Sequence, residues 1–188
     1  MAAGKSRVNL PNIITLMRIV LVPVIIWAIA SQQMKLAFVI FVVAGVSDAI
    51  DGFLAKRFNM VTDIGALLDP VADKALLVSI YMTLGIMEFI PRWLVILVVS
   101  RDVMIVGAVI ISWLLENPIP MKPLMVSKLN TVFQVAFAAL VLASLGFGFS
   151  ATPYDTILLG FVTIFTLLSV ALYLVEWARH MSTTEPLP

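Results

Sequence analysis

Six apolar stretches constrain the fold of this chain more than any other feature of its sequence. Each is close to the roughly 20 residues that an α-helix needs to cross a bilayer. Hydrophobic residues fill 62% of the 188 positions and charged residues 12%, and the mean hydropathy is +1.10. A soluble domain would be about half apolar and about a quarter charged. The sequence therefore predicts an all-α, polytopic membrane protein with six transmembrane helices, over roughly Ile13–Ala30, Leu36–Lys56, Thr62–Met87, Arg92–Leu115, Leu124–Gly146 and Pro153–Ala178.

The breaks between these stretches are too short for a soluble domain, so we expect residues 1–188 to form a single membrane domain. Within it, residues 1–12 are a candidate juxtamembrane segment and residues 179–188 a tail. The first stretch also resembles a signal peptide, because Lys5 and Arg7 precede it and it ends in Ala28-Ile29-Ala30. Arg18 inside the stretch and the five later spans favour a transmembrane helix instead. The net charge of +1 predicts no nucleic-acid partner, and the lack of cysteine excludes thiolate metal sites.

The basic residues of the breaks predict the orientation, because cytoplasmic loops carry an excess of Lys and Arg. With the N-terminus inside, only Lys35 and Arg92 fall outside. The cytoplasmic side then carries Lys5, Arg7, Lys56, Arg57, Lys122 and Arg179. We therefore expect both termini to face the cytoplasm. The sequence shows no transit peptide, which favours a bacterial inner membrane.

Four aspartates interrupt the second and third stretches. Asp48 and Asp51 lie near the inner end of the second, and Asp69 and Asp73 in the first half of the third. Spacings of three and four residues put each pair on one helix face. A short turn joins the two helices, so we expect antiparallel neighbours with all four acids roughly 10–16 Å from that turn. Glycines four residues from an acid on each helix would let the backbones approach closely.

Carboxylates at this depth are costly unless their charge is compensated. One or two hard cations such as Mg²⁺, Mn²⁺ or Ca²⁺ would suit a donor set made only of carboxylates. Two such ions could hold a pyrophosphate during a phosphoryl displacement, with one carboxylate as general base. The residues alone leave two alternatives open. One is a divalent-cation transporter, and the other is a set of structural ion pairs with Lys56, Arg57, Lys74, Arg101 and Lys128.

The same stretch resembles the CDP-alcohol phosphotransferase family, whose motif reads D-x2-D-G-x2-A-R-x8-G-x3-D-x3-D. Every spacing is kept here, by Asp48, Asp51, Gly52, Ala55, Lys56, Gly65, Asp69 and Asp73. The family usually has Arg where this chain has Lys56, and Arg57 follows directly. Lysine keeps the charge but loses the bidentate fork of arginine. Which of the two basic residues would hold a phosphate is therefore open.

The resemblance implies a six-helix membrane enzyme, commonly a homodimer, that moves a phosphatidyl group from CDP-diacylglycerol to an alcohol and releases CMP. It implies that Asp48, Asp51 and Asp69 bind two Mg²⁺ or Mn²⁺ ions. Asp73 would be a further metal ligand or the general base for the acceptor hydroxyl. The CDP moiety would bind at Gly52, Ala55, Lys56, Arg57 and Gly65. The active site would open toward the cytoplasm and admit membrane lipids. Polyprenyl-type transferases also hold pyrophosphate with aspartates, but with different spacing and more helices.

Three further segments bear on the acceptor alcohol. Leu10–Ile19 is similar to the amino-terminal signature of phosphatidylglycerophosphate synthases and cardiolipin synthases. Val99–Ile110 and Lys122–Val135 look like the eukaryotic-type cardiolipin synthase branch. Members that use glycerol 3-phosphate more often have Cys-Arg-Glu in place of residues 100–102. The resemblance therefore favours phosphatidylglycerol as acceptor, with glycerol 3-phosphate as the alternative.

Arg101 and Lys128 are basic residues within predicted spans, and such cations normally face a cavity or a partner. A phosphate on the acceptor would suit both of them. An ion pair is the alternative for Arg101, although adjacent helical residues diverge, so we expect Asp102 to be a poor partner. Residues of the first span that could line the same cytoplasmic cavity are Asn12, Thr15 and Arg18.

Overall fold

The structure is a computed structural model that describes residues 10–57, 63–114 and 125–183. Within these ranges it describes the backbone throughout. Side chains are described except at residues 10–16, 48–49, 51–57, 63–73, 106, 108–114 and 180–183.

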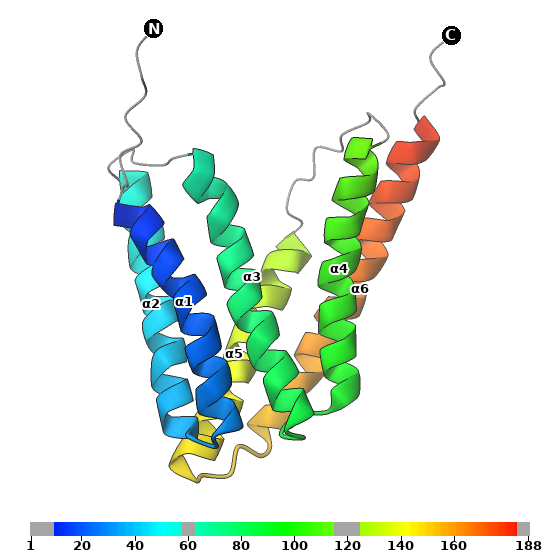
Figure 1. Cartoon of the computed structure of the whole chain (residues 1–188). Coiled ribbons are helices and arrows are strands. Elements are labelled where there is room, and N and C mark those ends of the chain that lie inside the picture. The colour runs from blue at the N-terminus through cyan, green and yellow to red at the C-terminus, as the bar shows by residue number, and fades with distance from the viewer. Residues whose placement is uncertain (1–9, 58–62, 115–124, 184–188) are drawn as a thin grey trace, which may run out of the picture. The chain divides into compact units, whose positions relative to one another are not determined.

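All six predicted helices are present in the described ranges (Figure 1). Their bounds are α1 Leu10–Ala30, α2 Met34–Arg57, α3 Asp63–Ile86, α4 Arg92–Leu114, α5 Met125–Phe147 and α6 Tyr154–Thr183. The all-α prediction is confirmed. The predicted spans agree with these helices, except that α1 begins before Ile13 and α6 continues past Ala178. The residues added to α6 from Arg179 on are mostly polar, so they prolong the helix with little added apolar length.

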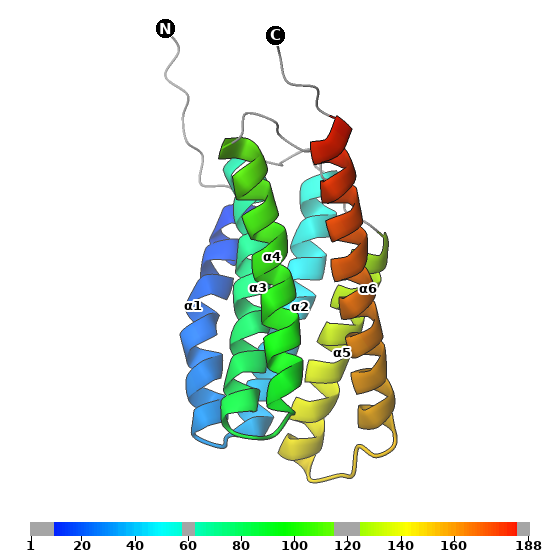
Figure 2. The ribbon, with the colours of Figure 1, turned by 90° about the vertical axis from the view of Figure 1, so that its right-hand side faces the viewer.

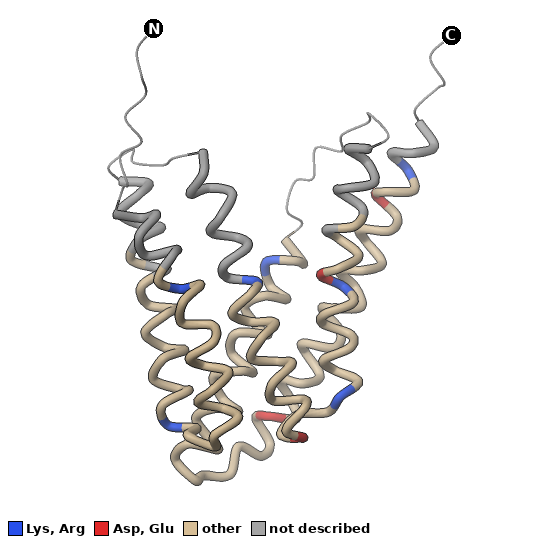
Figure 3. The backbone as a smooth tube through the Cα atoms, in the orientation of Figure 1, with Lys and Arg blue, Asp and Glu red and all other residues tan. Residues whose placement is uncertain are grey.

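Two helices in the described part of the chain are long and apolar enough to cross a membrane. They are Met125–Phe147 and Tyr154–Arg179. Shorter apolar helical segments cover Met17–Ala30, Met34–Ser47 and Lys74–Ile86. Charged residues are few along the described backbone, and long uncharged stretches separate them (Figure 3). That all six helices span the membrane, with both termini in the cytoplasm, stays a prediction.

The helices form two compact units. Unit 1 contains Met1–Met87 with Leu142–Phe149, and unit 2 contains Glu88–Val141 with Ser150–Pro188. Helix α5 therefore begins in unit 2 and ends in unit 1.

Helix α1 is the shared neighbour in unit 1, because it packs against both α2 and α3. Its contacts are apolar: Ile25 and Ile29 of α1 and Ile80 of α3 are fully buried. A tight turn joins α1 to α2, and Gln32 takes a left-handed conformation there with φ of 57°. The chain reverses at this turn, so α1 and α2 run in opposite directions. In turn, α3 runs opposite to α2 (Figure 1).

The end of α5 meets the start of α2 at Gly146. A Cβ atom added there would lie 3.0 Å from the backbone nitrogen of Lys35 and 3.1 Å from the carbonyl carbon of Met34. Only a glycine allows two backbones to come this close without a shift. One residue later, the Phe147 ring packs edge-on against Phe38, with ring centroids 5.7 Å apart.

In unit 2, helices α4 and α6 pack side by side and run in the same direction (Figures 1 and 2). Helix α5 joins α6 through side chains. Phe133 of α5 stacks on Phe161 of α6, with centroids 4.9 Å apart, and lies 5.0 Å from the ring of Phe165. Polar side chains extend this contact toward Arg101.

Candidate active site

The four motif aspartates lie on two helices of the same unit. Helix α2 carries Asp48 and Asp51, and helix α3 carries Asp69 and Asp73. Both helices pack against α1, which brings them into one compact unit. The four carboxylates themselves lie outside the described side chains. Their convergence at one depth, and direct contact between α2 and α3, therefore remain predictions.

The residues predicted to bind the CDP moiety cluster at the two helix ends that flank the α2–α3 connection. Gly52, Ala55, Lys56 and Arg57 form the last part of α2, and Gly65 lies in the first turn of α3. The structure describes their backbone and not their side chains. It therefore does not distinguish Lys56 from Arg57 as the phosphate-holding residue.

The chemistry of this donor set fits the predicted ions. It contains four carboxylates and no histidine or cysteine, and oxygen-only sets favour Mg²⁺ or Mn²⁺. Pairs at i, i+3 and i, i+4 place the two acids of each helix on one face. Among the described side chains elsewhere, no group of three His, Cys, Asp or Glu residues could hold a metal ion. The motif is thus the candidate metal site of this chain.

Arg18, predicted to line the cytoplasmic cavity of the active site, lines a groove between α1 and α2. That this groove is part of the predicted cavity stays a prediction. The groove has a volume of about 270 Å³, and Ser47 of α2 lines it as well. Although it is a charged residue in an apolar helix, Arg18 is only 3% exposed. The other two predicted lining residues, Asn12 and Thr15, lie in α1, and their side chains are outside the described set.

Arg101 is buried in unit 2, where its exposed fraction is 2%. Its guanidinium ties three helices together. The Nη2 group donates to Ser169 Oγ of α6 at 3.0 Å and also to Ser127 Oγ of α5, while Nε lies 3.3 Å from the same Ser169 oxygen. The Nη1 group donates to Asp102 Oδ1 at 2.5 Å. Four hydrogen bonds therefore orient this cation.

The expectation that Asp102 would be a poor partner for Arg101 is wrong. The two residues are adjacent in α4 and form an ion pair whose side chains are 2% and 12% exposed. Adjacent side chains on a helix point in different directions, and this keeps two short side chains from meeting. Arginine is long enough to curl back along the helix, and burial favours a nearby counter-charge.

Lys128, the second predicted phosphate residue, directly follows Ser127 in α5 and its side chain is exposed. It is not one of the residues to which the Arg101 guanidinium is bonded. The structure thus gives the two basic residues different settings. Arg101 is buried and held by its neighbours, whereas Lys128 is accessible from outside unit 2.

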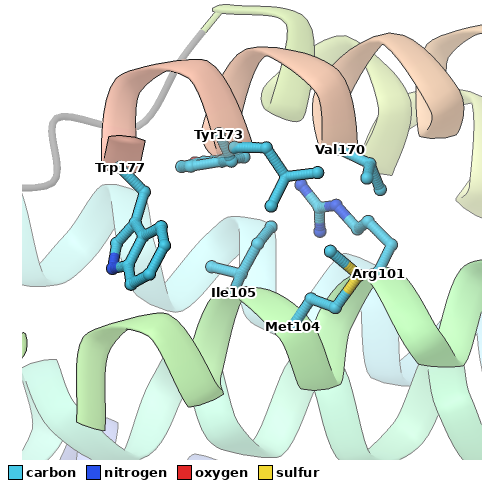
Figure 4. Close-up of a pocket in the computed structure, with 7 residues that line it drawn as sticks. Arg101, Met104, Ile105, Val170, Tyr173 and Trp177 are labelled. Carbon is cyan, nitrogen blue, oxygen red and sulfur yellow. The ribbon is translucent and has the colours of Figure 1, made fainter. Parts of the chain in front are cut away.

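A slot of about 160 Å³ between α4 and α6 adjoins Arg101 (Figure 4). Its other walls are apolar or aromatic, and Trp177 stands at the far end of the view from Arg101. The Tyr173 ring centroid lies 6.0 Å from Arg101 Cζ, within cation–π range. The slot therefore leaves one side of the guanidinium in an aromatic environment.

Sequence reasoning missed the polar side chains that surround Arg101. Besides Ser127 and Ser169, the fully buried Asn130 accepts a hydrogen bond from Thr166 Oγ1 at 2.9 Å, linking α5 to α6. A signal was present: Ser127 and Asn130, and likewise Thr166 and Ser169, are three residues apart in otherwise apolar helices. Small polar residues at such spacing mark helix–helix contacts in membranes.

Comparisons with known proteins agree with the motif. The family model for CDP-alcohol phosphatidyltransferase matches residues 8–179. Cardiolipin synthase (CMP-forming) of Homo sapiens is 32% identical over 181 residues, which cover 88% of this chain and 60% of that protein. CDP-diacylglycerol–glycerol-3-phosphate 3-phosphatidyltransferase of Bacillus subtilis (strain 168) is 30% identical over 177 residues, which cover 86% of this chain and 91% of that protein.

The rat cardiolipin synthase (CMP-forming) is 32% identical over 166 residues, which cover 80% of this chain. The chain spans 60% of the length of the human relative and 55% of the rat relative. The family model nevertheless covers nearly the whole chain and includes all the motif positions on α2 and α3. This chain therefore belongs to the CDP-alcohol phosphatidyltransferase family.

Proposed function

We propose that this protein transfers a phosphatidyl group from CDP-diacylglycerol to a hydroxyl of phosphatidylglycerol, giving cardiolipin and CMP. The observation that carries the proposal is the complete aspartate motif, with all its spacings, on two helices of one compact unit. The match of the family model over residues 8–179 supports it. The acceptor follows from the similarity of residues 99–110 and 122–135 to cardiolipin synthases.

The reaction needs a proton acceptor and a means to offset phosphate charge. Asp73 would take the proton of the acceptor hydroxyl, either alone or while also acting as a metal ligand. The hydroxyl oxygen then bonds to the phosphatidyl phosphorus, and the bond from that phosphorus to the bridging oxygen of CMP breaks. Divalent ions at Asp48, Asp51 and Asp69 would offset the negative charge of the pyrophosphate and of the departing CMP. Gly52, Ala55 and Gly65 carry little or no side chain, so the nucleotide could approach the helix backbones.

Arg101 and Lys128 would hold the phosphate of the acceptor. The hydrogen bonds from Arg101 to Ser127 and Ser169 support this role, because they orient the guanidinium before substrate binds. A charged donor strengthens its bond to a phosphate in a poorly hydrated site. Asp102 would then act as the counter-charge of Arg101 in the absence of acceptor.

The proposed setting is a membrane, with six spans, both termini in the cytoplasm and the active site open to that side. Many large apolar side chains of the described helices point outward, and lipid is a solvent that tolerates such a surface. We propose a homodimer in a bacterial inner membrane on the basis of the family resemblance.

Glycerol 3-phosphate is the second candidate acceptor. The observation that favours it is the Bacillus subtilis relative, whose name states this acceptor and of which 91% is covered by the match. Glycerol 3-phosphate also carries a phosphate, so Arg101 and Lys128 would serve either substrate.

The test is release of CMP by the purified protein with CDP-diacylglycerol and Mg²⁺ or Mn²⁺. Phosphatidylglycerol and glycerol 3-phosphate are offered separately, and lipid products are identified by mass. Cardiolipin formed only from phosphatidylglycerol is the expected result. Phosphatidylglycerophosphate formed only from glycerol 3-phosphate would replace the acceptor and keep the chemistry. No CMP release with either acceptor would overturn the proposed reaction and point to another alcohol. If CDP-diacylglycerol also failed to bind, a cation transporter would be favoured.

A further inference from the structure

Two pairs of polar residues lie where α5 and α6 pack in unit 2. Ser127 and Asn130 are three residues apart in α5, and Thr166 and Ser169 are three residues apart in α6. The two helices run in opposite directions (Figure 2), so equal steps along them keep the polar residues at matching levels. Each step of three residues is about 4.5 Å along the helix axis. The polar contact between α5 and α6 therefore has two levels.

The two levels are joined in different ways. At one level, the Thr166 hydroxyl donates directly to Asn130 Oδ1 at 2.9 Å. At the other, Arg101 of α4 bridges the helices by donating to Ser127 Oγ and to Ser169 Oγ, the latter at 3.0 Å. Both serines must therefore lie within reach of one guanidinium at the same time. A slip of α5 against α6 by one helical turn, about 5.4 Å, would take one of them out of reach.

The aromatic residues of this interface fix the register of the two helices poorly. Phe133 of α5 lies 4.9 Å from the ring of Phe161 and 5.0 Å from that of Phe165, one turn further along α6. One ring thus finds a neighbour at two successive turns. A buried polar pair is more selective, because a slip in register leaves its polar atoms without partners in an apolar interior. A single buried asparagine fixes the register of coiled coils in this way.

The Asn130–Thr166 pair is a poor device for stability alone. Both residues are fully buried, and within the described part of the chain the Asn130 Nδ2 group has no hydrogen-bond partner. A buried donor without a partner costs stability, and two apolar residues of similar shape would avoid that cost. What the pair adds is a preference for one register.

We propose that Asn130 and Thr166 are positioning residues, which set the register of α5 against α6 and thereby align Ser127 and Ser169 on Arg101. They act through Arg101 and not by touching the acceptor. Loss of the pair should weaken binding of the acceptor phosphate and leave the donor site in unit 1 unchanged. This inference rests on the proposed function, in which Arg101 holds the phosphate of the acceptor.

The decisive variant replaces both partners. Asn130→Leu with Thr166→Val removes the hydrogen bond without leaving either polar group buried alone, so the free energy of unfolding should stay near that of the wild type. The KM for the acceptor, phosphatidylglycerol or glycerol 3-phosphate, should nevertheless rise about tenfold, as expected for loss of one hydrogen bond to a charged group. The KM for CDP-diacylglycerol should not change. Thr166→Ser keeps the hydroxyl and should keep the wild-type KM. An unchanged acceptor KM in the double variant would overturn the proposal.

A double-mutant cycle tests whether the pair acts through Arg101. Arg101→Lys removes the guanidinium fork, so adding Thr166→Val to it should change the acceptor KM by less than about twofold. Additive effects would mean that Thr166 acts by another route and would overturn the proposal. Thr163→Val is the control, because it removes a hydroxyl of α6 that is bonded to the carbonyl of Leu159 in the same helix. It should leave the acceptor KM unchanged in both backgrounds.

The register is also measurable without any activity. The chain contains no cysteine, so Phe133→Cys and Phe161→Cys introduce two thiols that a short bifunctional maleimide can join. We expect efficient cross-linking, most of which is lost when Asn130 and Thr166 are both replaced. Unchanged cross-linking would reject the register role. Thr166→Val alone carries the same two measurements, so the proposal does not depend on folding of the double variant.

The proposed function and this inference fail in different ways. No CMP release by the wild-type chain would reject the proposed function, and cross-linking would still decide whether the pair sets the register. CMP release with unchanged cross-linking and an unchanged acceptor KM would keep the function and reject the inference.

Discussion

The two units use opposite means to hold their helices together. In unit 1 the described core is apolar, apart from Arg18 and the ring hydroxyl of Tyr81, and α1 presses against α2 and α3 through residues such as Ile25 and Ile80. Five of the six buried polar or charged residues other than tyrosine in the described part of the chain belong to unit 2. There, hydrogen bonds from Arg101 and Thr166 join α4, α5 and α6.

This difference follows from what each unit has to position. Unit 1 carries the acids, whose own charges and any ions they bind can set their geometry. In unit 2, protein groups hold the buried Arg101 in place, because an unpaired charge in an apolar setting is costly. Hydroxyls orient the cation without cancelling its charge, and one carboxylate balances it.

The largest expected effect is the loss of catalytic activity when an aspartate of unit 1 is replaced. Asp73→Asn keeps size and polarity but removes the carboxylate that would take a proton, so kcat should fall about 10²–10⁴-fold. Asn at Asp48, Asp51 or Asp69 should also remove most activity. CMP release is the measurement, and Asp155→Asn in α6, whose carboxylate accepts hydrogen bonds from Thr156 next to it, is the control. Near-normal turnover in Asp73→Asn would defeat its assignment as base.

Removal of divalent ions should affect activity as strongly as loss of an aspartate. With chelator present, CMP release should fall by at least about 10²-fold, because four carboxylates would then repel the pyrophosphate. Adding Mg²⁺ or Mn²⁺ should restore it. Full activity in metal-free buffer would contradict the two-ion site, while loss of nucleotide affinity along with activity would strengthen it.

Arg101→Ala should strongly destabilise unit 2. It removes the Arg101–Asp102 ion pair together with the hydrogen bonds to Ser127 and Ser169, and breaking a buried pair costs about 3–5 kcal/mol. The free energy of unfolding in detergent is the measurement. Arg92→Ala is the matched control, because the Arg92–Glu88 pair is exposed and should contribute little. Arg101→Lys should retain part of the stability but raise the KM for the acceptor, since lysine lacks the fork.

Gly146→Ala tests the close approach of the end of α5 to the start of α2 in unit 1. The added Cβ would meet backbone atoms of Lys35 and Met34 at 3.0–3.1 Å. Such overpacking typically costs about 1–3 kcal/mol. Gly107→Ala and Gly160→Ala in unit 2 meet nothing within 4 Å, so they should be neutral or stabilising. Thermal unfolding of the three variants would separate these outcomes, and equal shifts would argue against the contact.

The smallest effect concerns one hydrogen bond. Thr166→Val removes the donor to Asn130 across two helices and should cost about 1 kcal/mol. Thr163→Val removes a hydroxyl of the same helix that bonds only to the carbonyl of Leu159, one turn before it. That variant should be nearly neutral. If both variants lose the same stability, the hydrogen bond between α5 and α6 contributes no more than a hydroxyl bonded within its own helix.

The six helices of this protein could be predicted from the sequence, apart from the start of α1 and the end of α6, and the reason is physical. An apolar run that ends at Pro or at a charged pair has few alternatives in a membrane, where every backbone group must be hydrogen-bonded. The aspartate motif could be read just as directly, because helical periodicity alone puts its acids on shared faces. Arg18 and Ser47 line the same groove, and nothing in the sequence indicated that they share it.

The partners of Arg101 are the clearest case of what required the tertiary structure. Helical geometry argued against Asp102, whereas the structure pairs it with Arg101, and it adds Ser127 and Ser169, which are distant in sequence. By itself the sequence determined the six helices, the position of the acids along two of them and the family. Only the tertiary structure decided which polar side chains are buried together, because that depends on which helix faces meet and on how far long side chains reach.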